Sequence, residues 1–152
     1  MSPSEDAKRI ARRHFRVGFV ALAIFVMLGL VLESLHAFKS PMYLDVESEP
    51  RRLMWRLAHA HGTLLAMLHV IYALTIRAHA AAAKPFASAC FMIALVLIPG
   101  GFFAGGIALH GADPNAAVAL VPAGFVALIV ALVSVARSFG ETSRDDETKE
   151  DS

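Results

Sequence analysis

Four long stretches of the sequence contain no Asp, Glu, Lys or Arg, and they constrain the fold more than any other feature. They run over residues 17–32, 57–76, 86–110 and 116–136. A helix that crosses the hydrocarbon core of a bilayer needs about 20 mostly apolar residues. Hydrophobic residues make up 57% of the 152-residue chain and charged residues only 18%, whereas a soluble domain has about a quarter charged residues. The sequence therefore excludes a soluble enzyme domain and predicts a membrane protein.

The predicted fold is an all-α membrane protein, a bundle of four transmembrane helices. The spans are expected over about residues 15–37, 55–77, 86–110 and 116–137, within one domain that covers residues 1–140. Because the connections are short, neighbouring helices should run antiparallel in an up-down-up-down bundle. The first apolar run is longer than the core of a signal peptide, so we expect an uncleaved span. Residues 141–152 are polar and are predicted to form a disordered tail.

The distribution of basic residues predicts the orientation in the membrane, because cytoplasmic loops carry the excess of Lys and Arg. With the N-terminus inside, ten basic residues lie on the inner side and four on the outer side. The inner set is Lys8, Arg9, Arg12, Arg13, Arg16, Arg77, Lys84, Arg137, Arg144 and Lys149, and the outer set is Lys39, Arg51, Arg52 and Arg56. Both termini are therefore expected in the cytoplasm, with the protein integral to the inner membrane. The net charge of +1 gives no attraction for nucleic acid.

Several local signals describe the second half of the chain. Pro99-Gly100-Gly101 lies inside the third apolar run, where it predicts a kink. Gly101 and Gly105 form a GxxxG pattern, which favours close helix packing within the bundle. Asp113-Pro114 is expected to cap the fourth helix. The single cysteine, Cys90, is interpreted as a small packed residue.

The second span carries three of the seven histidines: His59, His61 and His69. At about 100° per residue, one half of this helix is polar and small, and the other is aliphatic. Lipid cannot solvate an imidazole, so the histidine-bearing half should face the bundle. His59 and His61 project about 160° apart, which argues against a chelate formed by these two alone.

A second set of polar residues is expected near the outer side of the membrane. Glu33 and His36 share one stripe of the first helix, and His110 ends the third span. The residues Glu33, His36 and His110 are thus candidate metal ligands, and His59, His61 and His69 are candidate cofactor ligands, since imidazole suits iron, copper and zinc. The alternative is a set of structural hydrogen bonds between helices. His14 and His79 are predicted to lie at the inner membrane boundary.

Three short motifs carry a resemblance to a known family. His36-Ala-Phe-Lys39, Ala58-His59-Ala-His61 and Val121-Pro122-Ala-Gly124 resemble elements of the UPF-type family of small four-helix inner-membrane proteins of unknown function, over about residues 17–136. The segment from Arg56 to His61 is also similar to the second helix of haem-copper oxidase-like membrane proteins. That second resemblance implies His59 or His61 as a haem ligand.

The leading functional hypothesis is a non-enzymatic accessory or structural subunit in the membrane, with a buried His/Glu polar seam and no catalytic residues. Its partners would be the lipid bilayer and either further copies of itself or a larger membrane complex. One alternative is a redox protein that holds haem or copper through His59 and His61 with Glu33, His36 or His110. A further alternative is a proton or small-solute conduit, formed as an oligomer, that uses Glu33, His69 and Tyr72.

Overall fold

The computed structural model describes residues 3–109 and 113–150, with side chains over residues 5–109 and 113–140. Within them the chain is helical and contains no β-sheet. The elements are α1 (Pro3–Ala37), α2 (Pro41–Leu44), η1 (Val46–Ser48), α3 (Glu49–Ala78), η2 (Ala80–Ala82), α4 (Pro85–Gly105), η3 (Ala116–Ala119) and α5 (Leu120–Glu150), where η marks a 3-10 helix. The four long helices α1, α3, α4 and α5 are each long and apolar enough to cross a membrane. The prediction of an all-α chain with four candidate spans is therefore confirmed.

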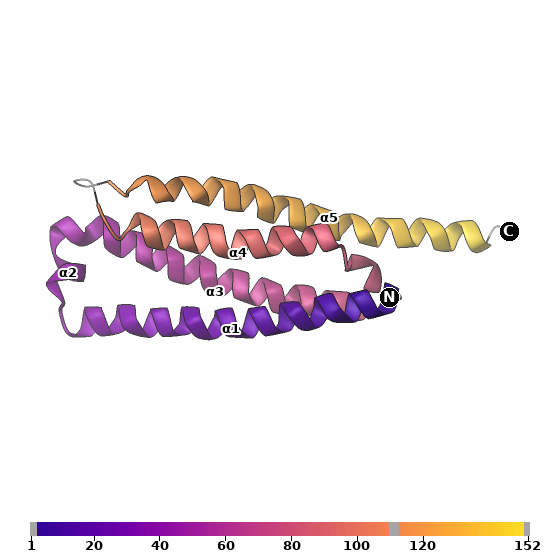
Figure 1. Cartoon of the computed structure of the whole chain (residues 1–152), viewed down its shortest axis with the longest axis horizontal. Helices are drawn as coiled ribbons and strands as arrows, with labels where there is room; N and C mark the ends of the chain where they lie inside the picture. Colours follow the sequence, from indigo (N-terminus) through magenta and orange to yellow (C-terminus); the bar gives the residue numbers. More distant parts are fainter. Residues whose placement is uncertain (1–2, 110–112, 151–152) are drawn as a thin grey trace.

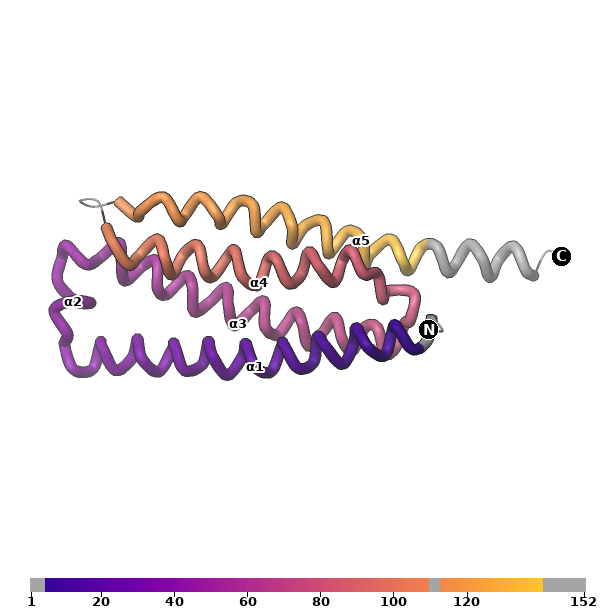
Figure 2. Tube along the Cα trace, viewed as in Figure 1, coloured from indigo at the N-terminus to yellow at the C-terminus, as the bar shows by residue number. Residues whose placement is uncertain are grey.

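Successive long helices pack side by side in the order α1, α3, α4, α5 (Figure 1). α3 contacts α1 on one side and α4 on the other, while α1 and α5 lie at the two edges. α3 crosses the layer obliquely, so that it is close to α1 where the chain begins and close to α4 near α2 (Figure 1). The tube in Figure 2 shows that the start of α1 and the later part of α5 lie on the same side of the molecule.

The two ends of the molecule differ in charge and are named here by their contents. The basic end carries the start of α1, with Arg9, Arg12 and Arg13, and the α4 start at Pro85. The α2 end carries the connection between α1 and α3 (Figure 1). At this connection Lys39 has a φ of 50°, and the Ser40 amide donates to the Leu35 carbonyl at 3.0 Å. This left-handed residue ends α1 and reverses the chain.

Proline lies in the first turn of three of the elements that follow α1. Pro41, Pro50 and Pro85 occupy the first turn of α2, α3 and α4, where the missing N–H has no helical partner to lose. Pro99 lies inside α4, which continues through it to Gly105. Gly101 shows the expected close packing within the bundle, because a Cβ there would lie 2.9 Å from Val121 Cγ2 of α5, whereas a Cβ on Gly105 would be at an ordinary 3.5 Å from Val118 Cβ.

Two local expectations differ from the structure. The cap before α5 is Asn115, whose side chain accepts a hydrogen bond from the Ala117 amide at 2.9 Å, and not Asp113. Asn115 takes this role because its position, two residues before Ala117, suits the short side chain. α5 continues to Glu150, and the disordered tail expected over residues 141–152 stays a prediction. The third helix ends at Gly105, earlier than the predicted residue 110, because Gly106 already leaves the regular helix.

The outer surface of the bundle is apolar, as expected for helices that cross a membrane. α1 and α5 expose large apolar side chains such as Phe19, Ile24, Val126 and Ile129, which a hydrocarbon surrounding would cover. The buried core consists of two clusters. One, nearer the basic end, includes Ile10, Tyr72, Ile76 and Phe91, and the other includes Leu65, Ile98 and Val121.

Candidate functional site

Three buried polar side chains from three different helices meet toward the basic end. His14 of α1 and His69 of α3 are both 0% exposed, and their Nδ1 atoms lie 2.9 Å apart. His14 Nε2 lies 2.8 Å from the hydroxyl of Ser88 of α4. His69 Nε2 lies 3.3 Å from the Phe91 carbonyl oxygen. We call His14, His69 and Ser88 the buried histidine cluster.

The partners of the buried histidine cluster determine which ring nitrogens carry protons. A carbonyl oxygen only accepts, so His69 Nε2 donates to Phe91 and, in a neutral ring, His69 Nδ1 accepts. His14 Nδ1 then donates to His69, and His14 Nε2 accepts from the Ser88 hydroxyl. Every ring nitrogen is used and no charge is needed. Because a charge inside a membrane is costly, this neutral arrangement is the stable one.

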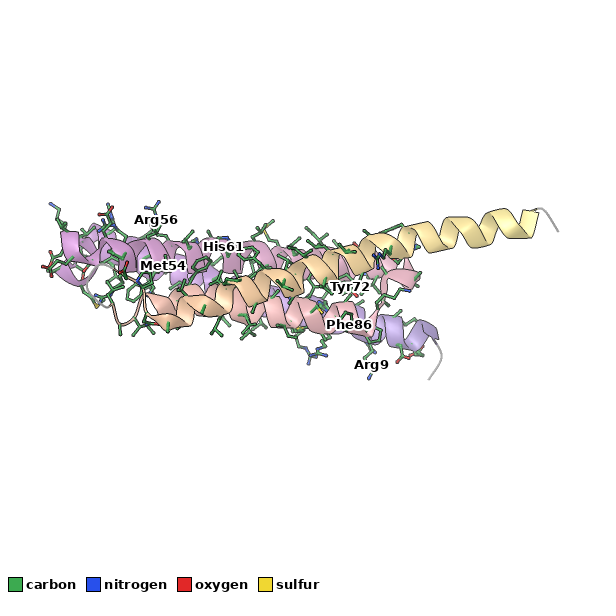
Figure 3. All side chains as sticks on the ribbon, turned by 90° about the horizontal axis from the view of Figure 1, so that it is seen from above. Arg9, Met54, Arg56, His61, Tyr72 and Phe86 are labelled. Carbon is green, nitrogen blue, oxygen red and sulfur yellow. The ribbon has the colours of Figure 1, made fainter. Side chains whose placement is uncertain are left out.

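Aromatic rings close the cluster from the surroundings. The ring of Tyr72 lies edge-on to His14, with centroids 4.7 Å apart, and Phe91 packs on Tyr72 at the same distance. The Tyr72 hydroxyl donates to the Ala82 carbonyl at 3.0 Å. Figure 3 shows Tyr72 among the helices in the half of the molecule nearer the basic end. The cluster therefore ties α1, α3 and α4 together and leaves no ring nitrogen free for a ligand.

His14, predicted to lie at the inner membrane boundary, has a fully buried side chain and does not face the surroundings of the bundle. The sequence contained a signal that points to burial. His14 shares one helical stripe with Ala7, Ala11, Gly18 and Ala21 at spacings of three and four, which is the small face that packs on α3. The neighbouring arginines lie off this stripe. His79, the other predicted boundary residue, is half-buried, and its Nε2 donates to the Ser138 carbonyl at 3.2 Å.

A polar pocket lies between α1 and α3 at the α2 end, with a volume of about 960 Å³. We call it the outer pocket. Its walls combine charged, polar and apolar residues: Val26, Gly29, Leu32, Glu33, His36, Tyr43, Leu44, Arg52, Arg56, His59 and Ala60. Three predicted site residues, Glu33, His36 and His59, thus line one cavity. Arg52 and Arg56, which were predicted only as basic residues of the outer side, line the same cavity.

His59 is held in place by two contacts with α1. Its Nδ1 donates to the Phe25 carbonyl at 2.8 Å, because a carbonyl cannot donate. Gly29 provides the space for the ring, since a Cβ there would lie 2.6 Å from His59 Cε1. In the neutral ring, Nε2 is left as an acceptor, and it has no hydrogen-bond partner within the described part of the chain.

The charged groups of the outer pocket are unpaired, in contrast to the buried histidine cluster. Within the described residues, Glu33, His36 and Arg56 have no side-chain hydrogen bond or ion pair. Arg52 donates one bond, from Nη1 to the Tyr43 carbonyl at 2.9 Å. The charges of the pocket also act on Tyr43. Burial raises the pKa of Tyr43 above its usual value. Arg56 and Arg52 lower this pKa, and Glu33 raises it.

A second cavity of about 950 Å³ adjoins the same two arginines and includes Glu47, Glu49, Leu53 and Pro114. Arg52 and Arg56 line both cavities. The second cavity contains no residue of α1, so Glu33 and His59 belong to the outer pocket alone. Figure 3 shows Arg56 at the α2 end with its side chain pointing away from the ribbon.

The remaining predicted ligands do not join the outer pocket. His61 lies on another face of α3, packed on Phe102 and Phe125 with ring centroids 5.1 and 5.8 Å away, and its Nδ1 donates to the Leu57 carbonyl. His69 belongs to the buried histidine cluster, and His110 lies outside the described residues. Among the described side chains, those of residues 5–109 and 113–140, no three of His, Cys, Asp or Glu come together in a way that could hold a metal ion.

Comparisons with known proteins give no further guide to the site. No family model, no curated protein and no solved structure matches this chain. The functional argument therefore starts from the geometry of the two polar regions.

Proposed function

We propose that this chain is a non-enzymatic accessory subunit of the inner membrane, with four spans and both termini in the cytoplasm, that binds an amphiphilic molecule in its outer pocket. The basic end then faces the cytoplasm and the α2 end faces the outer side. The four apolar helices support the membrane location. The resemblance to the UPF-type family of small four-helix inner-membrane proteins agrees with this proposal and stays a prediction.

One observation carries the proposal: the outer pocket has charged side chains without partners, at the level where the spans end. Glu33 lies in the last turns of α1, and Arg56 lies two turns into α3. Unpaired charges near hydrocarbon are expensive and mark functional positions. Because the pocket also has apolar walls at Val26 and Leu32, a ligand with a polar head and an apolar body fits its chemistry best.

The haem or copper alternative has less support. His59 lines the outer pocket, whereas His61 packs on Phe102 and Phe125 on another face of α3, so the two rings do not face one site. The conduit alternative combined Glu33 with His69 and Tyr72, but Glu33 is in the outer pocket, whereas the other two lie with the buried histidine cluster.

Native mass spectrometry of the purified protein tests the proposed function. After exchange into a lipid-free detergent, the wild type should retain one amphiphile per chain. Arg56→Gln should lose most of it, because the pocket loses its unpaired cation. Arg77→Gln is the matched control, since Arg77 is an exposed arginine at the opposite end of the same helix, and it should retain the ligand. A wild type without any retained molecule, or equal loss in both variants, would contradict the proposal.

A further inference from the structure

The outer pocket has charges of both signs on opposite walls, which restricts the kind of amphiphile that it can accept. Glu33 comes from α1, whereas Arg52 and Arg56 come from α3 and are spaced four residues apart, so they share one face of that helix. None of the three is paired with another. A purely anionic headgroup would leave Glu33 unpaired beside it, and a purely cationic one would face two arginines.

We infer that the outer pocket binds a membrane phospholipid with a zwitterionic headgroup that ends in a primary ammonium, the phosphatidylethanolamine class. This inference rests on the proposed function and names the ligand of the same pocket. The phosphate pairs with Arg56 and with the free N–H groups of Arg52, and the ammonium pairs with Glu33. Guanidinium groups match phosphate oxygens in geometry as well as in charge.

The acceptors in the pocket distinguish a primary ammonium from a quaternary one. An –NH₃⁺ group has three N–H donors. The Glu33 carboxylate and the free Nε2 of His59 are two acceptors on the pocket wall without a partner in the described chain. A trimethylammonium headgroup has no N–H donor and would leave both acceptors unused. The position of His59 is fixed by the Phe25 carbonyl, so this acceptor is oriented before the ligand arrives.

The apolar side of the pocket favours a lipid over a soluble zwitterion. Val26 lines the pocket about two helical turns below Glu33. Leu30 lies one turn from each of them on the same face of α1, and it is 58% exposed. This exposed strip continues from the charged groups toward the middle of the span. An acyl chain can therefore lie along α1 while the headgroup occupies the polar end.

The test uses the full-length protein in nanodiscs that contain equal amounts of phosphatidylethanolamine, phosphatidylcholine and phosphatidylglycerol with identical acyl chains. Native mass spectrometry then measures which lipid stays bound after release. The wild type should retain phosphatidylethanolamine over the other two by about three- to tenfold, as expected for a partly exposed charge-assisted hydrogen bond. Glu33→Gln should remove the preference over phosphatidylglycerol, because the carboxylate that repels an anionic headgroup is gone.

Two further variants separate this inference from the proposed function. Asp45→Asn is the matched control: it removes an exposed carboxylate near α2 that lines neither cavity, and it should keep the wild-type preference. Arg56→Gln should reduce retention of every phospholipid. Equal retention of the three lipids, or a preference unchanged by Glu33→Gln, would overturn the zwitterionic ligand while leaving the pocket as a lipid site. Absence of any retained lipid would overturn the proposed function as well.

Discussion

The two ends of this protein contain similar polar residues and use them in opposite ways. Toward the basic end, His14, His69 and Ser88 satisfy one another and a backbone carbonyl, and both rings are fully buried. At the α2 end, Glu33 and Arg56 line a cavity of about 960 Å³ without forming a bond to each other or to other described residues. The first region contributes to stability, and the second is available to a ligand.

The comparison shows that residue type alone does not identify a functional site in a membrane bundle. The hydrogen-bond and ion-pair partners of each side chain must be known as well. A histidine whose nitrogens all have partners holds helices together. A charge near the lipid boundary that has no partner within the chain is open to water or to a ligand. The following predictions compare the two regions by their effects on the free energy of unfolding.

The largest effect is expected at the buried histidine cluster. His14→Leu removes hydrogen bonds to both His69 and Ser88 and leaves polar atoms buried without partners, so the free energy of unfolding should fall by about 2 to 3 kcal/mol. Denaturant titration in bicelles measures this value. The control is His36→Leu, an exposed histidine of the outer pocket, which should leave stability almost unchanged. An equal loss of unfolding free energy in the two variants would contradict the claim that the buried histidine cluster stabilises the fold and the exposed His36 does not.

A somewhat smaller loss is expected where the outer pocket is shaped by close helix contact. Gly29→Ala places a Cβ 2.6 Å from His59 Cε1, so the ring must move away from the Phe25 carbonyl. The expected cost is about 1 to 2 kcal/mol, as for overpacking elsewhere. Gly100→Ala is the matched control in α4, because an added Cβ there would meet no side chain and no neighbouring helix within 4 Å. The same unfolding titration should show no loss for Gly100→Ala; a comparable loss would mean that Gly29 has no special role in packing.

Ser88→Ala sharpens the proton assignment within the buried histidine cluster. It removes the hydroxyl that donates to His14 Nε2 and should reduce the unfolding free energy by about 1 kcal/mol. Ser34→Ala removes a hydroxyl that bonds only to the Leu30 carbonyl of its own helix, so its effect should be clearly smaller. If Ser34→Ala were the more destabilising of the two, the hydrogen bond between α1 and α4 would not stabilise the fold as described.

The smallest effect on stability is expected for Glu33→Gln. The carboxylate has no partner in the described chain that the substitution could break, and the amide is nearly the same size. Thermal unfolding in lipid-free detergent should give the wild-type midpoint within error. A clear loss of stability would show that Glu33 has a structural partner and would remove it from the ligand site.

The sequence predicted the helices well because hydrophobic run length is a direct consequence of membrane thickness. It also placed Glu33, His36, His59, His61 and His110 at the same outer level, and three of them, Glu33, His36 and His59, line one cavity. It did not predict that Arg52 and Arg56 share their cavity, because this depends on the oblique path of α3 against α1 (Figure 1). The relative rotation of two helices is set by how they pack, so it cannot be predicted from the sequence of either helix alone.

The contact between His14 and His69 is a second example of a contact between helices that the sequence did not predict. Each residue was visible on a small helix face, but the two are 55 positions apart, and nothing local connects them. The charges of Arg12, Arg13 and Arg16 around His14 favoured a boundary position. The small stripe of Ala7, Ala11 and Gly18 was the better guide.

The most direct test of the contrast between the two regions is ¹⁵N spectroscopy of the histidine rings in uniformly labelled, membrane-embedded protein. His14 should carry its proton on Nδ1 and His69 on Nε2, with a ¹⁵N–¹⁵N coupling across the 2.9 Å hydrogen bond between their Nδ1 atoms. His36, exposed in the outer pocket, should show a signal averaged by exchange with water. Averaged signals without coupling at His14 and His69 would contradict a sealed, structural cluster.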